Sequence, residues 1–183
     1  MPNWVINQLK VSGKGADKIL QKYIDSEKEY FDFNKVIPMP KELSETEESS
    51  STPKEVFERN KRKYGYASWY DWAIDNWGTK WNAHDAYIVA NGDEVWFQTA
   101  WSAALPIVEK LSENHPELEF EIKYADEDIG YNTGLVVYKN GKIIELYEPL
   151  GGSKEAYELY FDLWGEDGWE WNEETQSYEY LDD

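Results

Sequence analysis

The 183-residue chain contains no cysteine and two histidines. The absence of cysteine excludes disulfides, thiol nucleophiles, iron–sulfur clusters and thiolate zinc sites, and two histidines are too few for a multi-histidine metal centre. No apolar run approaches the roughly 20 residues needed to span a bilayer. The N-terminal stretch MPNWVINQLKVSG also lacks the basic and apolar regions of a signal peptide. We therefore expect a cytoplasmic protein that needs no cofactor and has no membrane partner.

The chain also has few positively charged residues, and its net charge differs between its two halves. The chain has 18 Lys and Arg against 37 Asp and Glu, a formal charge of -19. Residues 1–85 are nearly balanced, with 13 basic and 14 acidic residues, whereas residues 86–183 carry 5 and 23. A field of this sign repels nucleic acid and anionic membranes and attracts basic protein surfaces. The sequence therefore predicts a protein partner with a basic surface and no direct contact with nucleic acid.

Aromatic residues are abundant, with 10 Trp, 14 Tyr and 6 Phe in a chain that is 41% hydrophobic. Such a composition favours one folded domain over a disordered chain. The last 41 residues hold 13 acidic residues and one basic residue, and the acids alternate with large aromatics. Because disordered acidic tails are poor in aromatics, we expect this segment to fold onto the body or onto a partner. The candidate partner-binding residues are Glu155, Glu158, Asp162, Glu166, Asp167, Glu170, Glu173 and Glu174.

The hydrophobic pattern predicts an α+β fold. Alternating apolar residues indicate strands at 5–11 and 118–124, and Asn-Gly turns at 91–92 and 140–141 each indicate a hairpin. Helical spacing or capping residues predict five helices: at 16–26, from a Thr52 capping box to Tyr64, at 68–77, from near Ser102, and from Ser153 to Gly165. The segment at 31–37 is predicted to be extended. The polar stretch at 41–52 is predicted to be a mobile loop.

This order is that of a ferredoxin-like split βαβ sandwich, with an antiparallel sheet and helices on one face. The helical, Trp-rich segment at about 52–82 is an insertion, and a hairpin and a helix are added after the core. We expect residues 1–150 to form this domain, with an acidic aromatic helix and tail at 151–183 packed on it.

The block WYDWAIDNWGTKW at 69–81 has two interpretations. In the first, the block forms an aromatic-lined pocket for a sugar or nucleobase, with polar contacts from Asp71, Asp75, Asn76 and Lys80. In the second, its Trp side chains pack the insertion against the sheet. The candidate pocket residues are Trp69, Trp72, Asn76, Trp77, Thr79, Lys80 and Trp81.

We identify no catalytic residue and no metal site. The Gly13-Lys14-Gly15 turn lacks the further residues of a phosphate-binding loop, and the acidic run at 126–128 fails the EF-hand pattern. His84 and Asp85 are adjacent, and adjacent side chains rarely face one another.

Several motifs occur together in an order typical of one family. They are MPNWVINQLKVSG at the start, FDFNKVIPMP at 31–40, the block at 69–81, TAWS at 99–102 and YADEDIGYNTG at 124–134. The chain thus resembles the YubB-like, Api-like ferredoxin-like domain proteins of phages and conjugative plasmids, over roughly residues 1–140. Val5 stands where the family often has Cys, and the tail after Gly151 lies outside the resemblance. The resemblance implies a ferredoxin-like fold and a mobile genetic element, and it implies no activity.

Three hypotheses follow. The first is a non-enzymatic phage or plasmid accessory protein whose acidic C-terminal half binds a basic surface of a host or element-encoded protein, in the manner of a nucleic-acid mimic that acts in counter-defence. The second is a small-ligand or carbohydrate binder or enzyme that uses the 69–81 block. The third is a structural protein that self-associates through an exposed edge strand.

Overall fold

The structure is a computed structural model that describes residues 3–25, 30–46, 52–166 and 168–181. In chain order its elements are β1 (Trp4–Ser12), η1 (Ala16–Lys18), η2 (Leu20–Tyr23), β2 (Ile24–Asp25), β3 (Tyr30–Phe31), η3 (Phe33–Lys35), α1 (Lys41–Ser44), α2 (Lys54–Tyr64), α3 (Trp69–Trp77), β4 (His84–Ile88), β5 (Glu94–Ala100), α4 (Leu105–Asn114), β6 (Glu119–Asp126), β7 (Thr133–Lys139), β8 (Lys142–Tyr147), α5 (Lys154–Trp164), β9 (Trp169–Asn172) and β10 (Ser177–Tyr180).

The main sheet has six strands in the order β4-β5-β1-β6-β7-β8, and every neighbouring pair is antiparallel. Helical connections lead from β1 to β4 and from β5 to β6. The two strands of each pair are therefore parallel, with β5 lying between β1 and β4 and β1 lying between β5 and β6. These are two interleaved split βαβ units, which is the predicted ferredoxin-like arrangement. β7 and β8 extend the sheet beyond β6.

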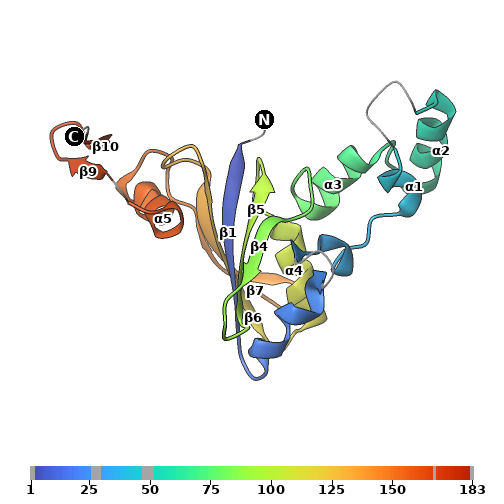
Figure 1. Cartoon of the computed structure of the whole chain (residues 1–183), viewed down its shortest axis with the longest axis horizontal. Coiled ribbons are helices and arrows are strands. Elements are labelled where there is room, and N and C mark those ends of the chain that lie inside the picture. Colours follow the sequence, from blue (N-terminus) through green and yellow to red (C-terminus); the bar gives the residue numbers. More distant parts are fainter. Residues whose placement is uncertain (1–2, 26–29, 47–51, 167, 182–183) are drawn as a thin grey trace.

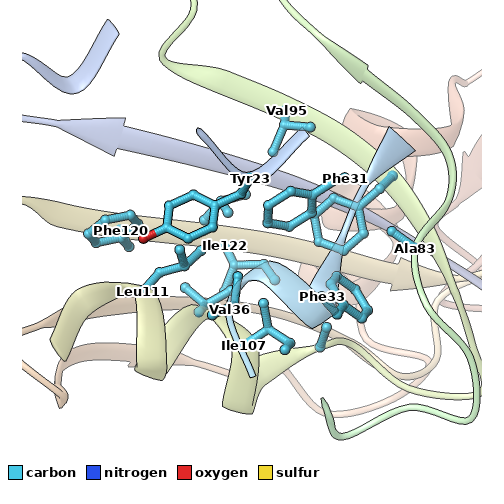
Figure 2. Close-up of a cluster of buried hydrophobic side chains, with 14 of the residues drawn as sticks. Tyr23, Phe31, Phe33, Val36, Ala83, Val95, Ile107, Leu111, Phe120 and Ile122 are labelled. Atoms are coloured by element: carbon cyan, nitrogen blue, oxygen red, sulfur yellow. The ribbon is translucent and has the colours of Figure 1, made fainter. Parts of the chain in front are cut away.

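One face of the sheet forms the main core with α4 (Figure 2). Phe31, Phe33 and Phe97 are nearly or fully buried, and their ring centroids lie 5.2–5.8 Å apart. Ile107 and Leu111 of α4 close the cluster from the helix side. Full burial of each such side chain contributes about 1.5–3 kcal/mol, so this face anchors the domain.

Helix α5 covers the opposite face, as Figure 1 shows, where α4 and α5 lie on either side of the sheet. In β6, Ile122 and Tyr124 belong to the main core, whereas the alternating Lys123 and Ala125 face α5. The Lys123 ammonium pairs with Asp162 of α5 at 3.2 Å. The acidic helix is thus attached directly to the sheet.

The insertion projects to the side of the sheet opposite the C-terminal hairpin (Figure 1). α3 holds it to the domain, because Trp72, Ala73 and Trp77 are buried in the main core. Gly78 ends α3 in the left-handed conformation, with φ 77°, as its position predicted.

Two local predictions were wrong in the first half of the chain, and one helix in the second half begins later than predicted. The α-helix predicted at 16–26 is replaced by η1, η2 and β2 up to Asp25, because contacts three residues apart serve a 3₁₀ helix as well as an α-helix. The extended segment predicted at 31–37 is confined to Tyr30–Phe31, because the Asp32 carboxylate accepts the Asn34 N–H and starts η3. The helix predicted from near Ser102 is present, and it begins at Leu105 with Pro106 in its first turn.

The polar stretch at 41–52 also differs from its prediction as a mobile loop. α1 begins at Lys41, and Leu43 is fully buried there. Residues 47–51 lie outside the described residues. α2 then begins at Lys54 with Pro53 as its N-cap and no side-chain cap, one residue later than the predicted capping box requires.

Candidate functional site

The first candidate site is a set of carboxylates on α5 and the β9–β10 hairpin, which we call the acidic surface. All of its described members are exposed, and Asp162 is the one described member that forms an ion pair. Asp167 lies outside the described residues. The acidic surface consists of Glu155, Glu158, Asp162, Glu166, Glu170, Glu173 and Glu174.

The sequence of α5 places three of these carboxylates on one side of the helix. Ser153 caps the helix by accepting the Ala156 N–H at 3.2 Å, as predicted. Ala156, Leu159 and Leu163 are buried towards the sheet, and Glu155, Glu158 and Asp162 on the other side of the helix are exposed. The Trp164 indole donates to the Ala125 carbonyl of β6 at 3.1 Å and ties down the end of the helix.

An aromatic cluster holds the β9–β10 hairpin on α5. The Phe161 and Tyr178 centroids lie 4.7 Å apart, those of Tyr157 and Tyr178 lie 5.0 Å apart, and Trp169 contacts Phe161 at 6.5 Å. These contacts make the acidic segment a folded unit, so its carboxylates have a fixed arrangement.

The negative field of this region acts on two tyrosines. Burial, reinforced by the charges of Glu158 and Glu166, raises the pKa of Tyr178. Burial, reinforced by Glu127, also raises the pKa of Tyr160. Glu127, on the loop after β6, is therefore close enough to α5 for its charge to act on Tyr160.

The second candidate site, the 69–81 block, divides into buried and exposed residues. Trp72, Trp77 and Thr79 lie in the interior, where the Trp77 indole donates to the Ile37 carbonyl at 2.9 Å. Trp69 is half-buried against the core, and the Asn76 amide donates to the Trp72 carbonyl of its own helix. A cavity lies next to α3 and is described below. None of these five residues lines it, so we leave them out of the candidate pocket.

Lys80 and Trp81 lie at the surface beside Trp101 and Tyr70. The Lys80 ammonium lies 4.9 Å from the Trp101 ring centroid, 5.0 Å from that of Trp81 and 5.4 Å from that of Tyr70. A cation at these distances is attracted to each ring. A cavity of about 390 Å³ adjoins this cluster and is lined by Tyr70, Asp71, Ile74, Asp75 and Trp101.

Trp101 has an unusual backbone conformation, with φ 72°. A bulky side chain in the left-handed region is strained and persists only where its surroundings fix it. Here the Trp101 N–H donates to the Asn3 carbonyl at 2.9 Å, and the Asn132 amide donates to the Trp101 carbonyl at 3.1 Å. The indole is thereby held at the cavity with 42% of its surface exposed.

Tyr70, Ile74 and Trp101 were not among the candidates from sequence. Tyr70 and Ile74 lie one helical turn apart, as do Asp71 and Asp75, on the side of α3 away from Trp72 and Ala73. Helical phase would have found these residues. Trp101 comes from a distant segment, and only the tertiary fold places it at the cavity.

Asp126, His84 and Asp85 make local contacts. The Asp126 carboxylate accepts from Asn3 at 3.1 Å and from Asn132 at 3.1 Å, so it fixes the loop that it starts. His84 Nδ1 lies 3.1 Å from the Asp85 carboxylate, contrary to our expectation that adjacent side chains do not meet.

The described residues contain no group of three or more acidic or histidine side chains arranged for a metal ion. Their helices include none with the length and apolarity required to cross a membrane.

The sequence model of a family described as "Ferredoxin-like domain in Api92-like protein" matches residues 76–179. The chain belongs to this family. The matched region contains most of the sheet, α5 and nearly all of the β9–β10 hairpin. It therefore includes most of the acidic segment, which the resemblance seen in the sequence left out.

Comparison with solved structures finds the crystal structure of a protein api92 from Yersinia pseudotuberculosis. The TM-score is 0.46 at 8% identity, and the match covers 83% of this chain and 99% of that one. Among curated proteins none matches. The fold assignment rests on the strand order and on the family match.

Proposed function

We propose that this Api92-like protein is a non-enzymatic accessory protein that binds a basic surface of another protein through its acidic surface. The observation that carries the proposal is that seven exposed carboxylates lie on a folded frame and only one of them has an ion-pair partner among the described residues. Carboxylates held in this way attract a basic surface at long range and pay little ordering entropy on contact.

Nucleic-acid mimicry is the more specific form of the proposal. Duplex DNA presents about one negative charge per 1.7 Å of axis, and a rigid acidic body competes with it for the same basic groove. The -19 net charge and its concentration after residue 86 support this form. The resemblance to phage and plasmid proteins supports a role in counter-defence. In this role the protein would act in the cytoplasm and inhibit a host defence protein that binds nucleic acid.

The test is capture of host proteins at low salt followed by elution in salt steps. We expect a basic nucleic-acid-handling protein to bind, to elute as salt rises, and to be displaced by duplex DNA added in solution. Binding that is equally strong from low to high salt contradicts the proposal. Salt-sensitive binding that DNA does not displace keeps the basic partner and removes mimicry.

Two variants of equal net charge localise the contact. Neutralising Glu158, Glu166 and Glu170 together with Gln removes three charges from the acidic surface. The control neutralises Glu55, Glu58 and Glu117, which are also exposed but lie outside the acidic surface. We expect the first variant to bind about tenfold more weakly at low salt and the control to bind nearly as the wild type does. Equal losses would mean that net charge alone, and no particular surface, attracts the partner.

The cavity beside Trp101 supports a second candidate function, the binding of a small carbohydrate. Sugars are recognised by exposed aromatic rings and by carboxylates that accept hydroxyl protons, and Trp101, Asp71 and Asp75 supply both. A glycan panel read by tryptophan fluorescence tests this function. We expect binding to be lost in Trp101→Ala and kept in Trp96→Ala, since Trp96 lies outside this cavity. No response to any sugar would remove this function.

A further inference from the structure

Strand β8 is the last strand of the six-stranded sheet, so no strand from the described part of the chain lies along its outer edge. All six of its residues are exposed. In an antiparallel ladder alternate residues direct their N–H and C=O groups away from the neighbouring strand. β8 therefore presents a row of backbone groups that another strand can pair with.

The side chains along this edge are unusually apolar for an exposed strand. Ile143, Ile144 and Leu146 are 53–55% exposed, and Tyr147 is 43% exposed. Leu150, just after the strand, is 83% exposed. Edge strands of monomeric proteins are commonly protected by charge or by an irregularity. β8 has an irregularity opposite Val137 and Tyr138, but its ladder is regular again from Glu145 to Tyr147.

The charges of the strand are arranged by sign. Lys142 stands at its start, and Glu145 lies in its second half. Neither has an ion-pair partner within the described ranges. Two copies of β8 aligned antiparallel about a two-fold axis would bring the lysine half of each next to the glutamate half of the other. A parallel alignment would place like charges together.

We propose that β8 pairs with β8 of a second copy of this chain, antiparallel about a two-fold axis, so that the two sheets become continuous. The occupant is a second copy because the strand is complementary to itself in charge, and the exposed isoleucines would be covered in the pairing. Two-fold dimers are also the commonest oligomers.

The dimer is independent of the proposed partner binding, and salt separates the two. Each copy carries -19, so repulsion between copies falls as salt screens it, and we expect dimerisation to strengthen from low salt to physiological salt. Attraction between the acidic surface and a basic partner weakens over the same range. Failure of either proposal therefore leaves the other testable.

The experiment is sedimentation of the full chain over a range of concentrations at physiological salt. We expect a monomer–dimer equilibrium. Lys142→Glu and Glu145→Lys should each weaken dimerisation about tenfold, because each places like charges opposite one another twice in the dimer. An equal mixture of the two variants should regain it, since the mixed dimer has only opposite charges at these positions. Lys14→Glu and Glu117→Lys, at exposed positions away from β8, are the controls and should dimerise as the wild type does.

Amide hydrogen exchange gives a second measurement that does not depend on the variants. We expect residues 142–147 to exchange more slowly as the protein concentration rises. A wild-type chain that stays monomeric at every concentration overturns the proposal, and leaves the edge to a strand of a different protein. A dimer that both charge variants leave intact, or one that the mixture fails to restore, overturns the antiparallel β8 interface.

Discussion

The Thr79 hydroxyl donates a 2.8 Å hydrogen bond to the Ala100 carbonyl, and both residues are fully buried. This bond joins the turn after α3 to the end of β5. Lys80 follows Thr79 and Trp101 follows Ala100, so this interior bond joins the two backbone segments that carry the Lys80 and Trp101 side chains. The Lys80 ammonium lies 4.9 Å from the Trp101 ring centroid, next to this bond.

We expect Thr79→Val to destabilise the protein by about 1–3 kcal/mol, since valine keeps the volume but leaves a buried carbonyl without its donor. Chemical denaturation measures the change. The control is Thr175→Val, at an exposed residue whose hydroxyl bonds exposed side chains, where we expect a change within about 0.5 kcal/mol. Equal effects at the two positions would mean that the bond to Ala100 is not significant.

Phe161 connects α5 to the C-terminal hairpin through Tyr178, with ring centroids 4.7 Å apart. We expect Phe161→Ala to cost about 2 kcal/mol and to expose the amides of β9 and β10 to rapid hydrogen exchange, while the main sheet stays protected. The control, Tyr87→Ala, removes an exposed ring from β4 and should leave the hairpin protected. Unchanged exchange in the hairpin of Phe161→Ala would mean that other contacts hold the acidic segment.

The sequence predicted the elements whose signals are local. The turns at Asn91-Gly92 and Asn140-Gly141 join β4 to β5 and β7 to β8, and Ser153 caps α5. Each signal depends on a conformation or a hydrogen bond within a few residues. The ferredoxin-like order could be derived from these elements because the strands fall in the sequence order that two split βαβ units require.

The rest depends on contacts between distant residues. Leu43 is buried in a stretch whose composition predicted a loop, because one apolar residue is too weak a signal against eleven polar neighbours. The cavity combines α3 with Trp101, some thirty residues further on. The left-handed backbone of Trp101 also could not be predicted from the sequence, because a tryptophan is seldom found in that conformation.

His115 gives a prediction about pH. Its Nε2 lies 2.8 Å from the Tyr23 hydroxyl, and burial, assisted by the charge of Lys22 and opposed by that of Glu117, lowers the pKa of His115 below its usual value near 6.5. The unfolded chain then binds a proton at a higher pH than the folded chain does. The free energy of unfolding should fall as pH decreases through about 6.5, and the fall should end once the pH is below the folded-state pKa.

Denaturation of the wild type and of His115→Gln across this range isolates the effect, since the carboxylates titrate in both. We expect the stability of the wild type relative to the variant to decrease as the pH falls. Tyr23→Phe removes the hydrogen bond but leaves most of the burial, so its pH dependence should resemble that of the wild type. A constant difference between wild type and His115→Gln would refute the assignment.

Trp101 allows its backbone strain to be separated from its side chain. With φ at 72°, an alanine at this position remains in the left-handed region, whereas a glycine adopts it without a steric cost. We therefore expect Trp101→Gly to be more stable than Trp101→Ala by about 1 kcal/mol, which reverses the usual preference for alanine. Thermal and chemical unfolding of the two variants measure the difference. Both remove the indole from the cavity, so any ligand that stacks on Trp101 should be lost equally from the two. If alanine were the more stable, the backbone at residue 101 would not be held in the left-handed region, and the fixed position of the indole at the cavity would lose its explanation.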